Sequence, residues 1–377
     1  METEGGEGQS CTLRQGNVML TYNFEYERKI KAGFIGCGGH SFRNIYPTFQ
    51  YAPVDLRAVC DLRLERAQAY ARQFGALNAY QSHHEMLEKE ELDAVFIVTN
   101  YDEEAKPRFP QLAIDVMNSG CHAWIEKPPA GSVSEINKMI AVSQHTKRFV
   151  SVGFKKCFFP AYEKVKQIIS AEDFGTPAAI YVRYPQSIPA EGDREDARKM
   201  LGFLDHIAHP GSILHHLMGK IRQVYFEDEP FNRGSMGILR FESGAIGTLH
   251  LASGQSGTSP LERVEVIGNG CNVVVDNCTK LTYYRRGGRG VGGYGRTPDY
   301  IGADDTAPIY WEPEFSLGQL YNKGIFLLGY APEIIYFCEC VLNDTAPTKC
   351  GLDMALEVTK LYEAYKNASG QVIQINS

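Results

Sequence analysis

Short apolar runs alternate with helix-spaced segments from residue 29 to residue 153, and this alternation most constrains the fold. The predicted strands are 30–35, 54–60, 94–99, 122–125 and 149–153. The predicted helices are 43–51, 64–74, 85–91, 109–119 and 134–145. Repeated βα units of this length predict a doubly wound parallel sheet, the Rossmann arrangement of an α/β protein.

The pattern changes after Gly153. Stretches rich in β-forming residues follow at 178–184, 223–226, 237–241, 245–252, 262–268 and 271–276. Two late helices are predicted at 331–342 and 353–367. This pattern predicts a second, α+β domain on a mostly antiparallel sheet. We therefore divide the chain into an N-terminal extension (1–28), a dinucleotide-binding domain (29–153) and a substrate-binding and oligomerisation domain (154–377).

Composition narrows the class of protein. The 377 residues carry a formal net charge of −7, which argues against nucleic-acid binding through overall electrostatics. The ten cysteines include no CxxC pair, so free thiols in a reducing compartment are expected. The chain has no signal-peptide pattern and no apolar run near the ~18 residues of a membrane span. We expect a cytoplasmic protein without a membrane or nucleic-acid partner.

One segment has a biased composition. Residues 285–296 are rich in glycine and arginine and resemble an RGG tract. A single copy inside a folded domain of an acidic protein is better explained as a loop than as an RNA-binding element.

A glycine-rich turn joins the first predicted strand to the next helix. Gly36 permits a sharp exit from the strand, and Gly38 lets the backbone approach a pyrophosphate. Gly39, His40 and Ser41 open the helix, where free amides face the anion. Ser41 occupies the third glycine position of the G-x-G-x-x-G pattern, so the pattern is imperfect. The strand before the turn and the helix after it favour a dinucleotide site.

Asp61 closes the second predicted strand. A carboxylate at this position can accept hydrogen bonds from both ribose hydroxyls and would repel a 2′-phosphate, so NAD is favoured over NADP. Arg63 would partly offset that repulsion. The alternative is that the glycines only form a turn and that Asp61 only caps the next helix.

The tripeptide Glu126-Lys127-Pro128 follows the apolar run 121–125. Proline restricts the residue before it, so Lys127 is held firmly at a strand end. Strand ends are where such a domain meets its ligand. The glycine turn and this lysine together suggest a nicotinamide-dependent oxidoreductase acting on a hydroxyl or carbonyl group.

A candidate catalytic group lies in the second domain. Asp205 and His209 are four residues apart and share a helical face. His209 is predicted to remove the hydroxyl proton as general base, and Lys127 to stabilise the developing alkoxide. Asp205 would orient the substrate or the histidine.

Two other interpretations of this histidine-rich segment are open. His206, His209, His215 and His216 could form a zinc site. Adjacent helical residues diverge by about 100°, which disfavours a shared metal, and no metal site is predicted. The segment could also be a polar helix end with satisfied histidines.

These residues resemble the Gfo/Idh/MocA oxidoreductases, named after glucose–fructose oxidoreductase and inositol dehydrogenase. The resemblance runs from about residue 29 to the C-terminus. The matching elements are 36–39, Asp61, the EKP motif at 126–128, 153–156 with Pro160, and the pair Asp205 and His209. Two positions depart from the family's D-x-G-x-H-x-x-D helix: Ile207 stands for its glycine and Ser212 for its second aspartate. The stretch after Asn100 also lacks a histidine common near the nicotinamide.

The resemblance implies a Rossmann domain, a C-terminal domain with an open sheet, and a homodimer or homotetramer. It implies a sugar, glycoside or inositol-like polyol as substrate, contacted by Lys156, Asp205 and His209. The cofactor-binding residues expected here are Gly36, Gly38, Gly39, His40, Ser41, Asp61, Arg63, Thr99, Asn100, Glu126 and Lys127.

Three functions follow from these expectations. The first is an NAD-dependent sugar or polyol dehydrogenase. The second is a redox-neutral enzyme that cleaves glycosides or eliminates through tightly bound NAD. The third is a non-catalytic NAD-binding regulator, which would not need the trio Lys127, Asp205 and His209.

Overall fold

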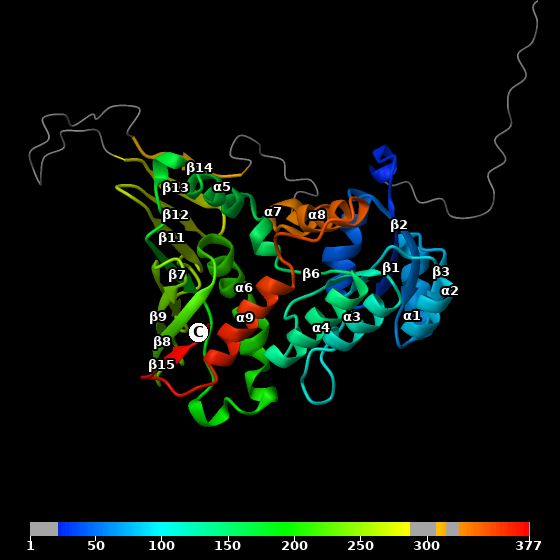
Figure 1. Ribbon diagram of the computed structural model, residues 1–377, viewed down its shortest axis with the longest axis horizontal. Coiled ribbons are helices and arrows are strands. Elements are labelled where there is room, and N and C mark those ends of the chain that lie inside the picture. The colour runs from blue at the N-terminus through cyan, green and yellow to red at the C-terminus, as the bar shows by residue number, and fades with distance from the viewer. Residues whose placement is uncertain (1–21, 287–306, 314–323, 377) are drawn as a thin grey trace, which may run out of the picture.

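The computed structural model describes residues 22–286, 307–313 and 324–376, which form two sheets with helices between and around them (Figure 1). The first sheet is the parallel sheet predicted for the Rossmann domain. The second is the predicted, mostly antiparallel sheet, and it lies at one side of the molecule.

The first sheet has six parallel strands in the order β3-β2-β1-β4-β5-β6. They are β1 Ile30–Ile35, β2 Val54–Cys60, β3 Asn78–Tyr80, β4 Ala94–Ile97, β5 His122–Ile125 and β6 Val150–Val152. The helices are α1 Leu64–Phe74, α2 His83–Lys89, α3 Phe109–Asn118 and α4 Val133–Thr146. The order reverses between β1 and β4, so this sheet has its topological switch point there.

The prediction of an α-helix over residues 43–51 is wrong. The chain instead forms a π-helical turn, Ser41–Ile45, followed by a 3₁₀ turn, Tyr46–Gln50. Pro47 lies at the start of the second turn and has no N–H to continue an α-helical ladder.

The second sheet has nine strands in the order β14-β13-β12-β11-β7-β10-β9-β8-β15. They are β7 Ala179–Tyr184, β8 Ile221–Asp228, β9 Ser235–Phe241, β10 Ile246–Leu251, β11 Arg263–Ile267, β12 Asn272–Asp276, β13 Lys280–Tyr284, β14 Ile309–Trp311 and β15 Val372–Gln374. Only β7 and β10 pair in parallel. Sequence analysis did not predict β3, β13, β14 or β15.

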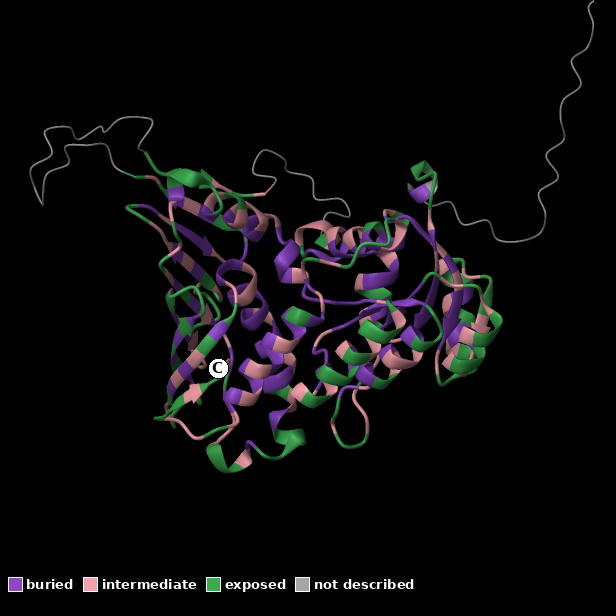
Figure 2. Ribbon diagram, viewed as in Figure 1, coloured by how far each residue is buried: buried purple, intermediate pink, exposed green. Residues whose placement is uncertain are grey.

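One face of this sheet is covered and the other is open. Alternate residues of β9 are buried, as expected for a sheet with one packed face (Figure 2). The covering helices are α5 Pro160–Ile169 and α6 Ala197–Met218, whose apolar side chains join the same core as the inward residues of the strands. Large apolar side chains remain on the open face: Tyr181, Met236, Ile238 and Ile246.

The last helices return to the first domain. A short helix, α7 Gly324–Leu327, precedes α8 Tyr330–Leu342, which buries Ile334 and Phe337 in the same core as Phe34 of β1. Helix α9 Leu352–Ala364 packs against α4, α6 and β6 (Figure 1). The C-terminal part of the chain therefore supplies core residues to the Rossmann domain.

Several sequence expectations concern the ends and loops. Residues 1–21 of the predicted extension and 287–296 of the glycine–arginine segment lie outside the described residues. Asn23 is buried and donates hydrogen bonds to the carbonyls of Phe49 (3.1 Å) and Val54 (2.7 Å), so the chain contacts the core from there on. The nine cysteines in the described ranges are buried free thiols. No described helix is long and apolar enough to cross a bilayer.

Arg194 provides a test of the second domain's packing. Its fully buried guanidinium donates to Asp228 Oδ2 (2.5 Å) and to the carbonyls of Asn367 (2.7 Å) and Pro189 (3.0 Å). Arg194→Ala would leave a carboxylate and two carbonyls without this donor, so we expect a loss of about 3–5 kcal/mol in the free energy of unfolding. Urea denaturation measures it. The exposed Arg72 on α1 is the control, and its replacement by alanine should change stability by less than about 0.5 kcal/mol.

Candidate active site

The turn after β1 needs a glycine at its first position. Gly36 has a φ of +109°, and a Cβ added there would lie 1.9 Å from the carbonyl oxygen of Val98. Gly38 differs, because a Cβ there would meet no protein atom within 4 Å. Protein packing therefore explains Gly36, whereas Gly38 borders open space in the cavity described below.

The side chain of Ser41 fixes the conformation of this turn by hydrogen bonds to its backbone. Its buried hydroxyl donates to the carbonyls of Gly36 (3.1 Å) and Gly38 (2.8 Å), and it accepts from the Gly38 amide at 3.0 Å. Where the G-x-G-x-x-G pattern has a third glycine, this chain uses a side chain to hold the loop.

Asp61 lies beside the same turn, at the end of β2. Its Oδ2 accepts from the Cys37 amide (2.9 Å) and its Oδ1 from the Arg63 amide (3.0 Å). The carboxylate is thereby fixed on the wall of a cavity of about 1050 Å³. Other predicted cofactor residues line this cavity as well: Gly36, Gly38, Gly39, His40, Ser41, Arg63, Thr99 and Asn100.

Lys127 meets Asp205 where the two domains adjoin. The Lys127–Pro128 bond is cis, and Lys127 Nζ lies 3.0 Å from Asp205 Oδ1 and 3.3 Å from its backbone carbonyl. The same carboxylate oxygen accepts from Tyr101 Oη at 3.0 Å. These three residues line a second cavity of about 260 Å³, which also borders Thr99, Asn100 and Glu126.

Glu126 connects the strand end to the glycine turn. Its Oε1 lies 2.9 Å from His40 Nε2, and its Oε2 accepts from the Lys127 amide at 2.8 Å. The His40 ring also makes an edge contact with Tyr330 of α8, at 5.9 Å between centroids. Helix α8 therefore reaches the site as well as the core.

His209 lies one helical turn after Asp205 and is half-buried. Its ring centroid is 6.2 Å from that of Tyr184, and its imidazole nitrogens make no hydrogen bond to any described residue. Burial, reinforced by Lys156, Lys127 and Lys155, lowers the pKa of His209 well below its usual value. The imidazole is therefore neutral at physiological pH. Asp205 is paired with Lys127 and Tyr101, and it does not hydrogen-bond to His209.

Lys156 is more buried than a substrate contact usually is. Its ammonium forms an ion pair with Glu262 and lies 4.8 Å from the centre of the Tyr184 ring. Its substrate role stays a prediction. The neighbouring Lys155 donates to Tyr330 Oη at 2.9 Å, and burial lowers its pKa.

The other histidines of α6 have separate surroundings. His206 is exposed, with Nδ1 2.9 Å from the Gly202 carbonyl, and His216 lies 3.9 Å from Glu163. Burial lowers the pKa of His216 to about 3. His215 Nδ1 is buried, and no described residue forms a hydrogen bond with it. Within the described ranges, these side chains and His209 do not form a metal-ligand group.

Two family models match the chain. The model described as "Oxidoreductase family, NAD-binding Rossmann fold" matches residues 30–154, and the "GFO/IDH/MocA C-terminal domain" matches 162–273. The chain belongs to the Gfo/Idh/MocA family of NAD-binding oxidoreductases.

Individual relatives are distant. Myo-inositol 2-dehydrogenase of Thermotoga maritima is 24% identical over 239 residues, 60% of this chain and 69% of that protein. A glycosyl hydrolase family 109 protein of a Shewanella species is 29% identical over 128 residues, 32% of this chain and 27% of that protein. The WlbA dehydrogenase from Bordetella pertussis, crystallised with NADH and UDP-GlcNAcA, has a TM-score of 0.65 at 20% identity, covering 92% of this chain and 99% of that one.

The residues present fit NAD. The open space beside Gly38 leaves room for a pyrophosphate, and the fixed Asp61 carboxylate on the same cavity wall can accept hydrogen bonds from ribose hydroxyls. Thr99 lines both cavities, and its Oγ1 has no hydrogen-bond partner among the described residues.

Sequence reasoning missed three residues of the site. Tyr101 binds Asp205, Tyr184 packs near His209, and Tyr330 brings α8 to His40. Tyr101 follows the Thr99-Asn100 pair directly, in the stretch that lacks the usual histidine. A polar residue at that position was the available signal.

Replacing the two glycines of the turn should affect different properties, NAD affinity for Gly38 and stability for Gly36. Gly38→Ala should leave the thermal unfolding midpoint unchanged and weaken NAD binding by on the order of tenfold, because the methyl group enters the cavity. Gly36→Ala should lower the midpoint, since the Cβ meets the Val98 carbonyl and a positive φ costs about 1–3 kcal/mol. Calorimetric titration and thermal unfolding measure both effects. Equal NAD affinity in Gly38→Ala and the wild type would contradict this assignment.

Proposed function

We propose that the protein is an NAD-dependent dehydrogenase that oxidises or reduces a secondary hydroxyl or carbonyl of a sugar, glycoside or inositol-like polyol. The observation that carries this proposal is the Lys127–Asp205 pair, 3.0 Å apart, at the edge of a polar cavity that shares residues with the dinucleotide cavity. Hydride exchange is the chemistry that bound NAD supplies.

Lys127 provides positive charge for an alkoxide. Its side chain is mostly buried, so its charge acts in a medium of lower dielectric constant than water. Asp205 holds the ammonium in place, and Tyr101 holds the Asp205 carboxylate. A substrate hydroxyl that approaches Lys127 would meet a donor that is already oriented.

His209 acts as the general base in oxidation and the general acid in reduction. Its neutral imidazole can accept the hydroxyl proton, and the lysines around it oppose a resident positive charge. The proton taken up by His209 would be passed on readily, because its imidazolium form is disfavoured at this position.

The substrate class rests on the relatives. The names of two of them mention inositol and a UDP-sugar. The tyrosines and lysines near His209 are suited to hydroxyl groups, and Lys156 remains the predicted substrate contact on this domain.

Asp61 favours NAD over NADP. Both carboxylate oxygens are held by backbone amides, so the negative charge cannot turn away from a 2′-phosphate. Arg63 is exposed and would offset the repulsion only in part.

A redox-neutral reaction is the second candidate. The glycosyl hydrolase family 109 relative supports it, although the match covers a small part of that protein. Net formation of NADH distinguishes the two. A silent NAD-binding regulator would turn over no substrate at all.

We also propose that a second copy of the chain covers the open face of the nine-stranded sheet. Tyr181 and Ile238 flank Thr248 in one cross-strand row, and both are about half exposed, at 47% and 56%. Large apolar residues gathered on one face are typical of an interface.

Replacing Lys127 tests the proposed mechanism. A screen of inositols, aldoses and UDP-sugars with NAD, followed at the NADH absorbance, should identify a substrate for the wild type. For that substrate, Lys127→Ala should lower kcat by about 10²–10³-fold, because the alkoxide loses its charge partner. NAD affinity should change much less than kcat, because Lys127 lines the smaller cavity and not the dinucleotide cavity. Lys280→Ala on β13, an exposed lysine, is the control. Undiminished turnover by Lys127→Ala would refute the role given to Lys127.

The lowered pKa of His209 predicts a pH profile. A base with an ordinary histidine pKa loses activity as the pH falls through about 6.5. His209 stays neutral in that range, so kcat/KM for oxidation should decline only at lower pH. Steady-state kinetics from pH 4.5 to 8 would measure it. An acid limb centred at or above 6.5 would argue against His209 as the base.

A further inference from the structure

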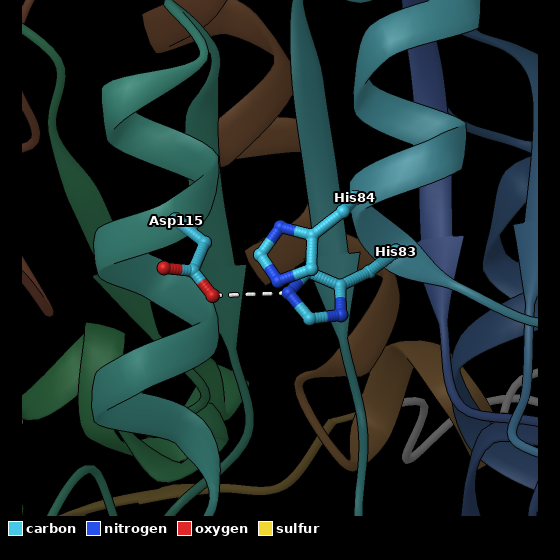
Figure 3. A group of neighbouring side chains, drawn as sticks. All are labelled: His83, His84 and Asp115. Atoms are coloured by element: carbon cyan, nitrogen blue, oxygen red, sulfur yellow. Dashed lines mark hydrogen bonds and ion pairs between the residues drawn. The ribbon is translucent and has the colours of Figure 1, made fainter.

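A group of metal-binding side chains lies apart from the catalytic pair, on the wall of the larger cavity. His83 and His84 come from the first turn of α2, and Asp115 comes from α3 (Figure 3). One ligand atom from each residue lies within 4.8 Å of the others, and within the described ranges this is the group that meets that condition.

Two of these side chains are already at coordinating distance. His83 Nε2 and Asp115 Oδ2 lie 3.0 Å apart and are joined by a hydrogen bond. Ligand atoms in a tetrahedral site with metal bonds of about 2.0–2.2 Å are separated by about 3.3–3.6 Å. A metal ion that replaces the hydrogen-bonded proton would therefore require His83 Nε2 and Asp115 Oδ2 to move apart by only a few tenths of an ångström.

His84 is the side chain that a simple histidine–aspartate pair does not explain. Its ring lies against that of His83, with centroids 3.9 Å apart (Figure 3). It makes no hydrogen bond to any residue in the described ranges, and it is exposed enough to rotate. An imidazole nitrogen is thus available beside the other two ligand atoms.

Asp115 is oriented from its other side. Gln111, one turn earlier on α3, donates to Asp115 Oδ1 at 2.8 Å. A partner that fixes the unused oxygen of a carboxylate is typical of the second shell of metal sites. The site therefore combines two ligands from α2 with one from α3, and Gln111 fixes the orientation of the α3 ligand.

We propose that His83, His84 and Asp115 bind one divalent transition-metal ion between α2 and α3. Two imidazoles and one carboxylate favour zinc and its neighbours cobalt and nickel over magnesium or calcium. All three residues line the cavity, so water or a ligand in the cavity can complete the coordination. This departs from the sequence expectation of no metal site, which weighed only the histidines of α6.

The test is a titration of the full-length, chelator-treated protein with Co²⁺, followed by its visible absorption, with Zn²⁺ as competitor. The proposal expects one equivalent bound. His84→Ala and Asp115→Asn should each weaken binding by about tenfold or more, since even outer partners of metal ligands contribute about 10–100-fold. His145→Ala on α4 removes another exposed histidine and should have no effect.

A second measurement guards against misfolding. Zn²⁺ should raise the thermal unfolding midpoint of the wild type and of His145→Ala, because the ion binds the folded protein and joins two helices. The same shift should be lost in His84→Ala, whose own midpoint without metal should match the wild type. No cobalt binding, or binding that both ligand variants retain, would overturn the proposal.

Discussion

The apolar packing of α8 and α9 against the first domain determines how the two domains of the molecule are positioned relative to each other. Ile334 and Phe337 join the core that contains Phe34, and α9 lies between α4 and α6. Lys127 and Asp205 belong to different domains, so their 3.0 Å contact depends on this packing. A loss of apolar contacts in α8 would therefore disturb the site without any change of a charged residue.

Each of the three lysine ammonium groups near His209 has a partner, which is a carboxylate in two cases and a hydroxyl in the third. Lys127 is bound by Asp205, Lys156 by Glu262, and Lys155 by the neutral hydroxyl of Tyr330. Burying several ammonium groups together is costly unless anions accompany them. The two carboxylates make the cluster possible. Burial, reinforced by the positive charge of the lysines, lowers the pKa of His209.

The sequence predicts those parts of the fold that local residue patterns determine, such as the longer strands of the first sheet and the turn after β1. Strand β4 is a continuous apolar run, β1 and β2 are short and mostly apolar, and the turn at 36–39 is marked by its own glycines. Strands β3 and β15, three residues each, are too short for a periodic pattern. The pairing of Asp205 with Tyr101, 104 residues away, leaves no local signal. Adjacent histidines suggest divergence, whereas His83 and His84 stack at the start of their helix.

The hydrogen bonds of Ser41 have a consequence for the thermodynamics of binding. A loop that becomes ordered only around its ligand loses conformational entropy in doing so, which lowers affinity. Here the amide of Gly38 is already tied to Ser41 and that of Cys37 to Asp61. The turn after β1 therefore has its final shape before a dinucleotide arrives, and association there involves little loop ordering.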